Sequence, residues 1–225
     1  MDDTMLIITS DHGDEQGEHY PPHIGHQLHL YQSGIHVPLI IRYPDAFPEG
    51  RRVEGLAQTL DIFPTVLDVL SVEDPSVWAQ VQGVSLLRVA RGEVERGFAL
   101  SEHQRPLLSF ERMLRRDPKY DFRRWDRRLK ALIVGDYKYI WSSDGRDELY
   151  NLKRDPSESE NLIEEESDVA REMRERLLAV LSSMERRDLG DFVQGSEENV
   201  RLLERLGYLR KLGPAPRLAM AGLSP

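Results

Sequence analysis

The feature that most constrains this chain is a short apolar run that leads directly into a histidine-rich segment. Residues Met5 to Thr9 read MLIIT, and six of the seven histidines follow within residues 12–36. Such a run, rich in β-branched side chains, predicts a strand buried on both faces, as in a parallel sheet. Because ligands bind beyond the carboxyl ends of such strands, Asp11 and His12 occupy the expected place of a site.

Asp11 and His12 are the candidate metal ligands. A carboxylate supplies charge and oxygen and a neutral imidazole supplies a lone pair, so two neighbours on a tight turn can reach one cation. The residues alone leave open a simpler interpretation, in which residues 10–34 form a solvated polar loop whose histidines bind nothing. Long loops inside compact domains are usually functional, which favours the site.

The rest of the chain alternates strand and helix signals. Strands are expected at residues 37–42, 98–101, 129–134, 137–141 and 148–152, and helices from residues 61, 164 and 196. The Gly135-Asp136 pair between two β-rich runs predicts a hairpin. The acidic run from Glu158 to Glu166 is expected to be a solvated approach to the second helix.

These signals predict three parts. Residues 1–95 form an α/β part, residues 96–190 form a mainly antiparallel β part covered by a helix, and residues 191–225 form a helical tail. With 225 residues and 40% hydrophobic content, the chain can build one large domain or a domain with a small appendage.

Composition excludes several classes of site and partner. The net charge of −9 argues against general affinity for nucleic acid. With no cysteine, the chain has no disulfide, thiolate metal site or cysteine nucleophile. No apolar run approaches the roughly 18 residues of a membrane span, so no membrane partner is expected. The N-terminus does not read as a signal peptide, which leaves the localisation open.

A series of motifs follows in order along most of the chain. It comprises T-S-D-H-G-D at 9–14, G-E-H at 17–19, L-Y at 30–31, V-P-L-I-I-R at 37–42, D-I-F-P-T-V-L at 61–67, Q-G-V-S-L at 82–86, Y-K-Y-I at 137–140, E-L-Y-N-L at 148–152, D-P at 155–156 and E-N-L at 160–162. This series resembles the signature of sulfatases, which belong to the alkaline-phosphatase-like superfamily. The resemblance implies an α/β fold: the C-terminal part of an alkaline-phosphatase-like α/β/α sandwich, plus a small antiparallel sheet subdomain packed by a helix.

The resemblance also assigns roles to individual residues. It implies that Asp11 is a carboxylate ligand to a divalent cation, usually Ca²⁺, and that His12 fills the next ligand position. The cation would hold a sulfate oxygen as a Lewis acid. His26 matches a histidine that binds the sulfate or protonates the leaving oxygen, although Gln27 stands where the family usually has glycine. His29 is a rival for contact with the substrate.

One family feature is absent from the sequence. Sulfatases use a formylglycine nucleophile made from the first residue of C-x-P-x-R or S-x-P-x-R, and no residue here lies in that frame. The resemblance therefore places the nucleophile and the first half of the central sheet in a missing N-terminal part. We expect the chain alone to have no turnover, and to expose an apolar sheet edge at residues 5–9 or 37–42.

The substrate implied is a sulfate ester of a small molecule or a carbohydrate. Sulfate and phosphate esters share tetrahedral oxyanion geometry, so a phosphodiesterase or phosphonate hydrolase of the same superfamily is the alternative enzyme. A different class is a non-catalytic polyanion-binding remnant, because residues 105–130 carry ten Lys/Arg with interleaved aromatic residues. The simpler interpretation of that stretch is an insertion that packs its aromatic residues on the domain.

Overall fold

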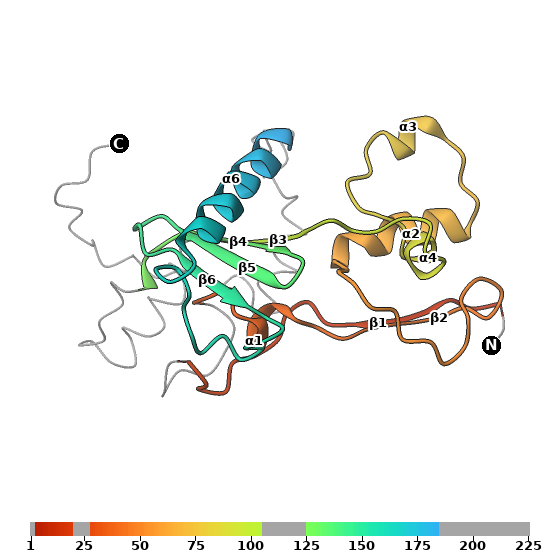
Figure 1. Ribbon diagram of the computed structural model, residues 1–225. Coiled ribbons are helices and arrows are strands. Elements are labelled where there is room, and N and C mark those ends of the chain that lie inside the picture. The colour runs from red at the N-terminus through yellow and green to blue at the C-terminus, as the bar shows by residue number, and fades with distance from the viewer. Residues whose placement is uncertain (1–2, 20–27, 105–124, 185–225) are drawn as a thin grey trace, which may run out of the picture. The chain divides into compact units, whose positions relative to one another are not determined.

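The computed structural model describes residues 3–19, 28–104 and 125–184 (Figure 1). Its strands form two separate sheets, one of two strands and one of four. Both sheets belong to a compact unit of residues 1–181, and the described part of the second unit is only the end of the last helix. The predicted division near residue 95 stays a prediction, and the predicted helical tail lies outside the described residues.

The first sheet is a two-stranded ribbon. Strand β1 (Leu6–Thr9) pairs antiparallel with strand β2 (Leu39–Arg42). Both strands were predicted, but the prediction of a parallel strand buried on both faces is wrong. Leu6 and Ile8 are each 48% exposed, because no other strand pairs with β1 among the described residues. The predicted exposure of an apolar edge at these strands is confirmed.

Short helices follow the ribbon, and a buried carboxylate links the start of one of them to the turn before another. They are η1 (Thr59–Asp61), α2 (Ile62–Val69), α3 (Pro75–Trp78) and α4 (Leu86–Ala90). The Asp61 carboxylate is fully buried and accepts hydrogen bonds from the backbone N–H groups of Gln58 and Val84, each at 2.8 Å. The Arg96 guanidinium donates to the same carboxylate, with its Nε at 2.7 Å. This buried, fully paired charge fixes the start of α2 against the turn before α4.

The second sheet is an antiparallel meander of four strands in the order β3-β4-β5-β6. Its strands are β3 (Ala99–His103), β4 (Leu129–Val134), β5 (Tyr137–Ser142) and β6 (Glu148–Asn151). The predicted hairpin between β4 and β5 is confirmed. Gly135 has a φ of 55° there, a conformation that glycine adopts at no steric cost.

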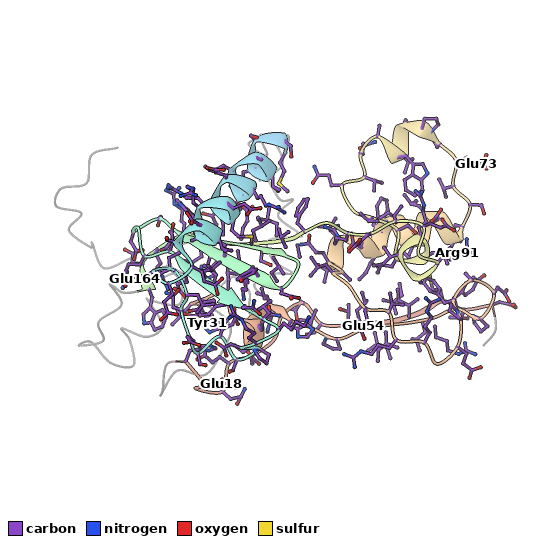
Figure 2. All side chains as sticks on the ribbon, in the orientation of Figure 1. Glu18, Tyr31, Glu54, Glu73, Arg91 and Glu164 are labelled. Atoms are coloured by element: carbon purple, nitrogen blue, oxygen red, sulfur yellow. The ribbon has the colours of Figure 1, made fainter. Side chains whose placement is uncertain are left out.

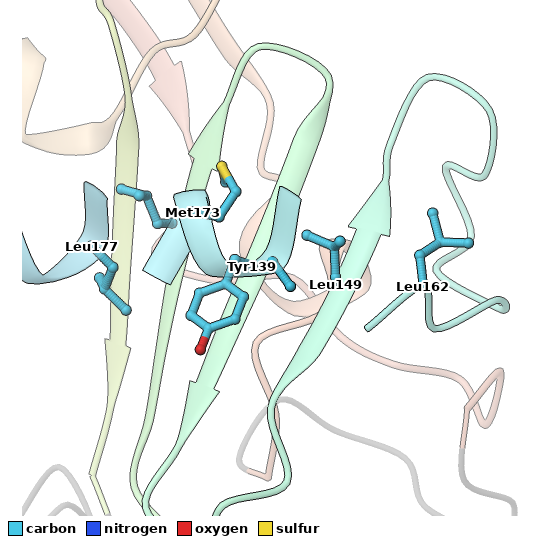
Figure 3. Close-up of a cluster of buried hydrophobic side chains, with 7 residues drawn as sticks. Tyr139, Leu149, Leu162, Met173 and Leu177 are labelled. Carbon is cyan, nitrogen blue, oxygen red and sulfur yellow. The ribbon is translucent and has the colours of Figure 1, made fainter. Parts of the chain in front are cut away.

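Helix α6 (Ser167–Ser183) covers one face of this sheet, as the sequence predicted (Figure 3). Its Met173 and Leu177 pack on Tyr139 and Leu149 of the sheet. The opposite face is also buried, because Leu30 and Tyr31 of the histidine-rich segment join a cluster with strand residues Leu129, Ala131, Ile140 and Tyr150. Leu30 and Tyr31 therefore pack on the face of the sheet opposite α6.

In the part of the chain that the structure describes, no helix has the length and apolar composition that crossing a membrane requires.

Candidate functional site

Asp11 and His12 follow β1 directly, as predicted. The Asp11 side chain is 86% exposed and the His12 side chain 38% exposed. His12 Nδ1 lies 2.9 Å from the carbonyl oxygen of Gly13 and donates to it, so in the neutral form of the ring the lone pair lies on Nε2. That Nε2 is 3.7 Å from Asp11 Oδ2. One oxygen donor and one nitrogen donor therefore lie close together.

The pair supplies only part of a coordination sphere. Calcium takes six to eight oxygen-rich ligands, whereas residues 3–19, 28–104 and 125–184 contain no group of three or more acidic or histidine side chains that could hold a metal. Asp11 and His12 fit two ligand positions of a divalent cation, with the remaining ligands to come from elsewhere.

A close backbone approach fixes the turn that carries this pair. The Gly13 N–H donates to the carbonyl of Gly34 at 2.9 Å. A Cβ atom on Gly13 would lie 2.1 Å from the Ser33 carbonyl oxygen, which is far inside contact distance. Glycine is required at position 13 because only hydrogen fits against α1 (Gln32–Ile35).

Of the two histidines predicted to contact substrate, the structure describes only His29. His26 lies outside the described residues. The His29 side chain is 1% exposed, and its Nε2 meets the fully buried Glu15 carboxylate. Its Nδ1 accepts the backbone N–H of Tyr31 at 3.3 Å, so Nε2 is the protonated nitrogen. His29 thus lies in a buried cluster of protein groups, and its contact with substrate stays a prediction.

Tyr31 connects the histidine-rich segment to the four-stranded sheet (Figure 2). Its ring stacks on His19, with ring centroids 3.9 Å apart, and on His29, with centroids 4.9 Å apart. Its hydroxyl donates to Glu148 of β6 at 2.7 Å. Glu148 also accepts the Tyr150 hydroxyl at 2.8 Å, and burial, followed by the Glu148 charge, raises the pKa of Tyr150. The positions of His19 and His29 therefore depend on the hydrogen bond between Tyr31 and Glu148 of β6.

A buried ion pair makes a second connection. Glu158 is 2% exposed, and its carboxylate lies 2.6 Å from Lys138 Nζ on β5. Its other oxygen accepts the Gln32 backbone N–H at 2.5 Å, at the first residue of α1. Burial lowers the pKa of Lys138, and the Glu158 charge opposes that shift. The two residues join β5 to the helix that follows the histidines.

The prediction that the acidic run is solvated is therefore wrong for its first residue, Glu158. The sequence of β5 contains a feature that indicates the Lys138–Glu158 pair. The alternation of β5 places Lys138 on the same face as Ile140, which packs in the core, so a lysine there needs a buried acid.

The basic stretch is described only from Trp125 onward. Trp125 is 4% exposed, which agrees with the interpretation that its aromatic residues pack on the domain. Arg127 is 5% exposed rather than solvated. Polyanion binding by residues 105–124 lies outside the described residues and stays a prediction.

The sequence matches known proteins along most of its length. A family model described as Sulfatase matches residues 1–72. Arylsulfatase K of Rattus norvegicus is 27% identical over 184 residues, 80% of this chain and 30% of that protein. Choline-sulfatase of Rhizobium meliloti is 29% identical over 164 residues, 73% of this chain and 28% of that protein. The chain thus spans less than a third of the length of these curated relatives.

Solved structures share the fold. The structure described as BT4656 in complex with its substrate D-glucosamine-2-N,6-O-disulfate matches with a TM-score of 0.59 and 26% identity, over 81% of this chain and 34% of that one. The phosphonate monoester hydrolase of Agrobacterium radiobacter matches with a TM-score of 0.62 and 28% identity, over 80% of this chain and 35% of that one.

Proposed function

Because this chain belongs to the sulfatase family, we propose that it is the C-terminal portion of a sulfuric ester hydrolase. The observation that carries the proposal is the donor pair of Asp11 and His12, placed directly after β1 inside the region that the family model matches. The sulfate ester would belong to a small molecule or a carbohydrate, in keeping with the names of the relatives.

We assign Asp11 and His12 to two ligand positions of a divalent cation, and we infer that this cation is Ca²⁺. Such a cation, when bound, supplies Lewis-acid polarisation of a sulfate oxygen. In the neutral form of the His12 ring, Nε2 offers a lone pair close to the Asp11 carboxylate. The nitrogen donor is unusual for calcium, so the pair also tolerates softer divalent ions.

His26 and His29 take different parts in this proposal. His26 contacts the sulfate or protonates the leaving oxygen, as the family motif implies. His29 is a positioning residue, because its ring is buried between Glu15 and Tyr31 and both of its nitrogens face protein groups. It packs against Tyr31, whose side chain lies on the four-stranded sheet.

The nucleophile comes from polypeptide that these 225 residues do not include, because no cysteine or serine begins a C/S-x-P-x-R frame. The exposed apolar face of the ribbon supports this, since Leu6, Ile8 and Ile40 require a cover that the described residues do not provide. The complementary portion would carry the formylglycine and cover this face. The 225 residues alone are therefore expected to be inactive.

A phosphonate monoester hydrolase is the second candidate activity. It is supported by the Agrobacterium radiobacter structure, which has 28% identity to this chain. The sulfatase family model and the curated sulfatases favour sulfate esters.

Calcium titration tests the metal assignment without depending on turnover. Isothermal titration calorimetry of the protein extended by its complementary portion should detect calcium binding that Asp11→Asn weakens by at least tenfold, as loss of one charged ligand implies. Asp136→Asn is the matched control, since Asp136 is a half-exposed aspartate in the β4–β5 turn. Equal affinity in Asp11→Asn and in the unaltered chain would exclude Asp11 as a ligand.

Activity is tested separately. Sequencing the DNA upstream of the Met1 codon shows whether an in-frame C/S-x-P-x-R exists, and the extended protein is then assayed on an aryl sulfate and a phosphonate monoester. We expect hydrolysis of the sulfate by the extended protein and none by the 225 residues. Calcium-dependent sulfate hydrolysis by the 225 residues alone would contradict the proposed division.

A further inference from the structure

Glu158 is a buried carboxylate in a turn whose neighbouring residues are exposed. Its side chain is 1% exposed, whereas Ser157, Ser159 and Glu160 are all exposed. Its backbone φ is 53°, in the left-handed region that favours glycine. A glutamate in this conformation is strained, and such strain persists where the surrounding structure over-determines the residue. The contacts of the buried carboxylate are what offset the strain here.

The turn of residues 155–160 is fixed to the end of β6. The Asp155 N–H donates to the carbonyl of Asn151, the last residue of that strand, at 2.8 Å. The Asp155 carboxylate then accepts the backbone N–H groups of Ser159 and Glu160 at 2.7 and 2.9 Å. The buried glutamate is therefore presented from the four-stranded sheet by a turn with its own hydrogen bonds.

From this turn the Glu158 carboxylate reaches α1. It accepts the N–H of Gln32, the first residue of α1, at 2.5 Å. Tyr31, which precedes the helix, makes no side-chain cap, so the carboxylate acts as the acceptor that an N-cap residue would supply. The carbonyl oxygen of Ser157 lies 3.0 Å from His19 Nε2. One turn of the β subdomain thus contacts the histidine-rich segment at two points.

Helix α1 in turn contacts the backbone beside the proposed metal ligands. The Gly34 carbonyl accepts the Gly13 N–H at 2.9 Å, and the Ser33 carbonyl lies so close that a Cβ on Gly13 would be 2.1 Å from it. The Gly13 carbonyl accepts from His12 Nδ1 at 2.9 Å. A helix of four residues has few internal hydrogen bonds, so its position depends on contacts at its ends. A shift of α1 would therefore move the backbone that orients His12.

We infer that Glu158 is a positioning residue for the metal ligands, an inference that rests on the proposed function. Its carboxylate holds the N-terminus of α1, and the contact of α1 with Gly13 sets the turn that carries Asp11 and His12. Glu158 itself touches neither metal nor substrate in this role. The subdomain of the four-stranded sheet thereby takes part in presenting a ligand pair that follows a strand of the other sheet.

The test removes the hydrogen bond to α1 without leaving a buried charge. Lys138→Met is the common background, in which Glu158→Gln keeps an oxygen for the Gln32 N–H and Glu158→Leu does not. Hydrogen exchange of the Gly13 amide in the 225-residue chain, followed by NMR, is the readout, because this N–H donates to Gly34. We expect exchange to be about fivefold faster with Leu than with Gln at position 158, the factor that corresponds to one net hydrogen bond.

Controls separate positioning from general loss of stability. The amides of β4, in the interior of the four-stranded sheet, should exchange at the same rate in both variants. Glu160→Leu, at an exposed side chain of the same turn, should leave Gly13 exchange unchanged. Should Glu158→Leu not fold, Glu158→Gly in the same background removes the acceptor and also relieves the positive φ. Equal Gly13 exchange with and without the acceptor, or an equal increase in β4, would overturn the inference.

Calcium affinity of the protein extended by its complementary portion gives a second readout. The variant with Leu at position 158 should bind calcium about threefold more weakly than the variant with Gln, a smaller factor than for a residue that contacts a ligand directly. Asp11→Asn distinguishes the two possible failures. Calcium affinity that Asp11→Asn leaves unchanged overturns the metal assignment. Affinity that Asp11→Asn weakens but the acceptor at position 158 does not affect overturns the role of Glu158.

Discussion

The two sheets of this protein are built from similar residues and end in opposite environments. Leu132 of β4 and Leu149 of β6 are fully buried, between helix α6 on one face and the histidine-rich segment on the other. Leu6 and Ile8 of β1 are about half exposed. Other elements of the chain cover both faces of the four-stranded sheet, whereas the described residues leave Leu6 and Ile8 of the ribbon uncovered. The apolar residues of a strand indicate that the strand is buried in the complete fold. Whether they are buried depends on the elements that cover them.

The same contrast holds for charges. The Lys138–Glu158 pair of the β subdomain is fully buried, whereas the Lys153–Asp136 pair at its surface has side chains 77% and 54% exposed. Buried pairs depend on both partners, because removal of one leaves a charge with neither water nor a counter-ion. Exposed pairs contribute little, since water replaces the partner.

The largest expected effect follows from this difference in charge burial. Glu158→Gln should lower the free energy of unfolding by about 3–5 kcal/mol, because it leaves the Lys138 ammonium buried without a counter-charge. Lys153→Met, at the exposed pair, should change it by less than about 1 kcal/mol. Urea denaturation followed by circular dichroism measures both.

A double variant sharpens this prediction. Lys138→Met combined with Glu158→Gln removes both charges and should be less destabilised than Glu158→Gln alone. If the double variant is as unstable as the sum of the two single variants, the pair is not energetically coupled and the contrast with the surface pair fails.

A matched leucine pair tests the contrast between the sheets themselves. Leu132→Ala should cost about 2–5 kcal/mol of unfolding free energy, because it opens a cavity between β4 and α6. Leu6→Ala, at a side chain 48% exposed on β1, should change it by less than about 0.5 kcal/mol. Equal losses in the two variants would mean that the ribbon is covered in solution, for example by another copy of the chain.

The smallest expected effect concerns Asp144 in the β5–β6 turn. Although burial opposes the shift, hydrogen bonds from Arg146 and Ser142 lower the pKa of Asp144 from 3.8 to about 2. A lowered pKa in the folded state means that the ionised form stabilises the fold above pH 3.8, and that this contribution is lost as the pH falls toward 2.

Asp144→Asn checks this sign. The stability difference between the unaltered chain and Asp144→Asn should be largest above pH 4 and should shrink as the pH falls toward 2. Thermal melts across that range measure it. A difference that stays constant with pH would show that Asp144 does not contribute through its charge.

Local patterns in the sequence were enough for much of the fold. The Gly135-Asp136 pair predicted the β4–β5 hairpin, and the apolar spacing from Val169 to Met184 predicted α6 to within a few residues. These elements form from contacts near in sequence, namely turn geometry and helical periodicity. The placement of Asp11 and His12 directly after a strand was predictable for the same reason.

The tertiary structure decided which polar groups are buried. His29 and Glu15 pair out of water, and Glu158 leaves an acidic run to meet Lys138, because their partners lie far along the chain or on another element. The exposure of Leu6 and Ile8 was likewise decided by which elements reach them. The sequence by itself determined the strands, the hairpin, the helix and the family motifs, since these depend on neighbouring residues. Burial and pairing depend on distant residues brought together, and they became visible only in the folded chain.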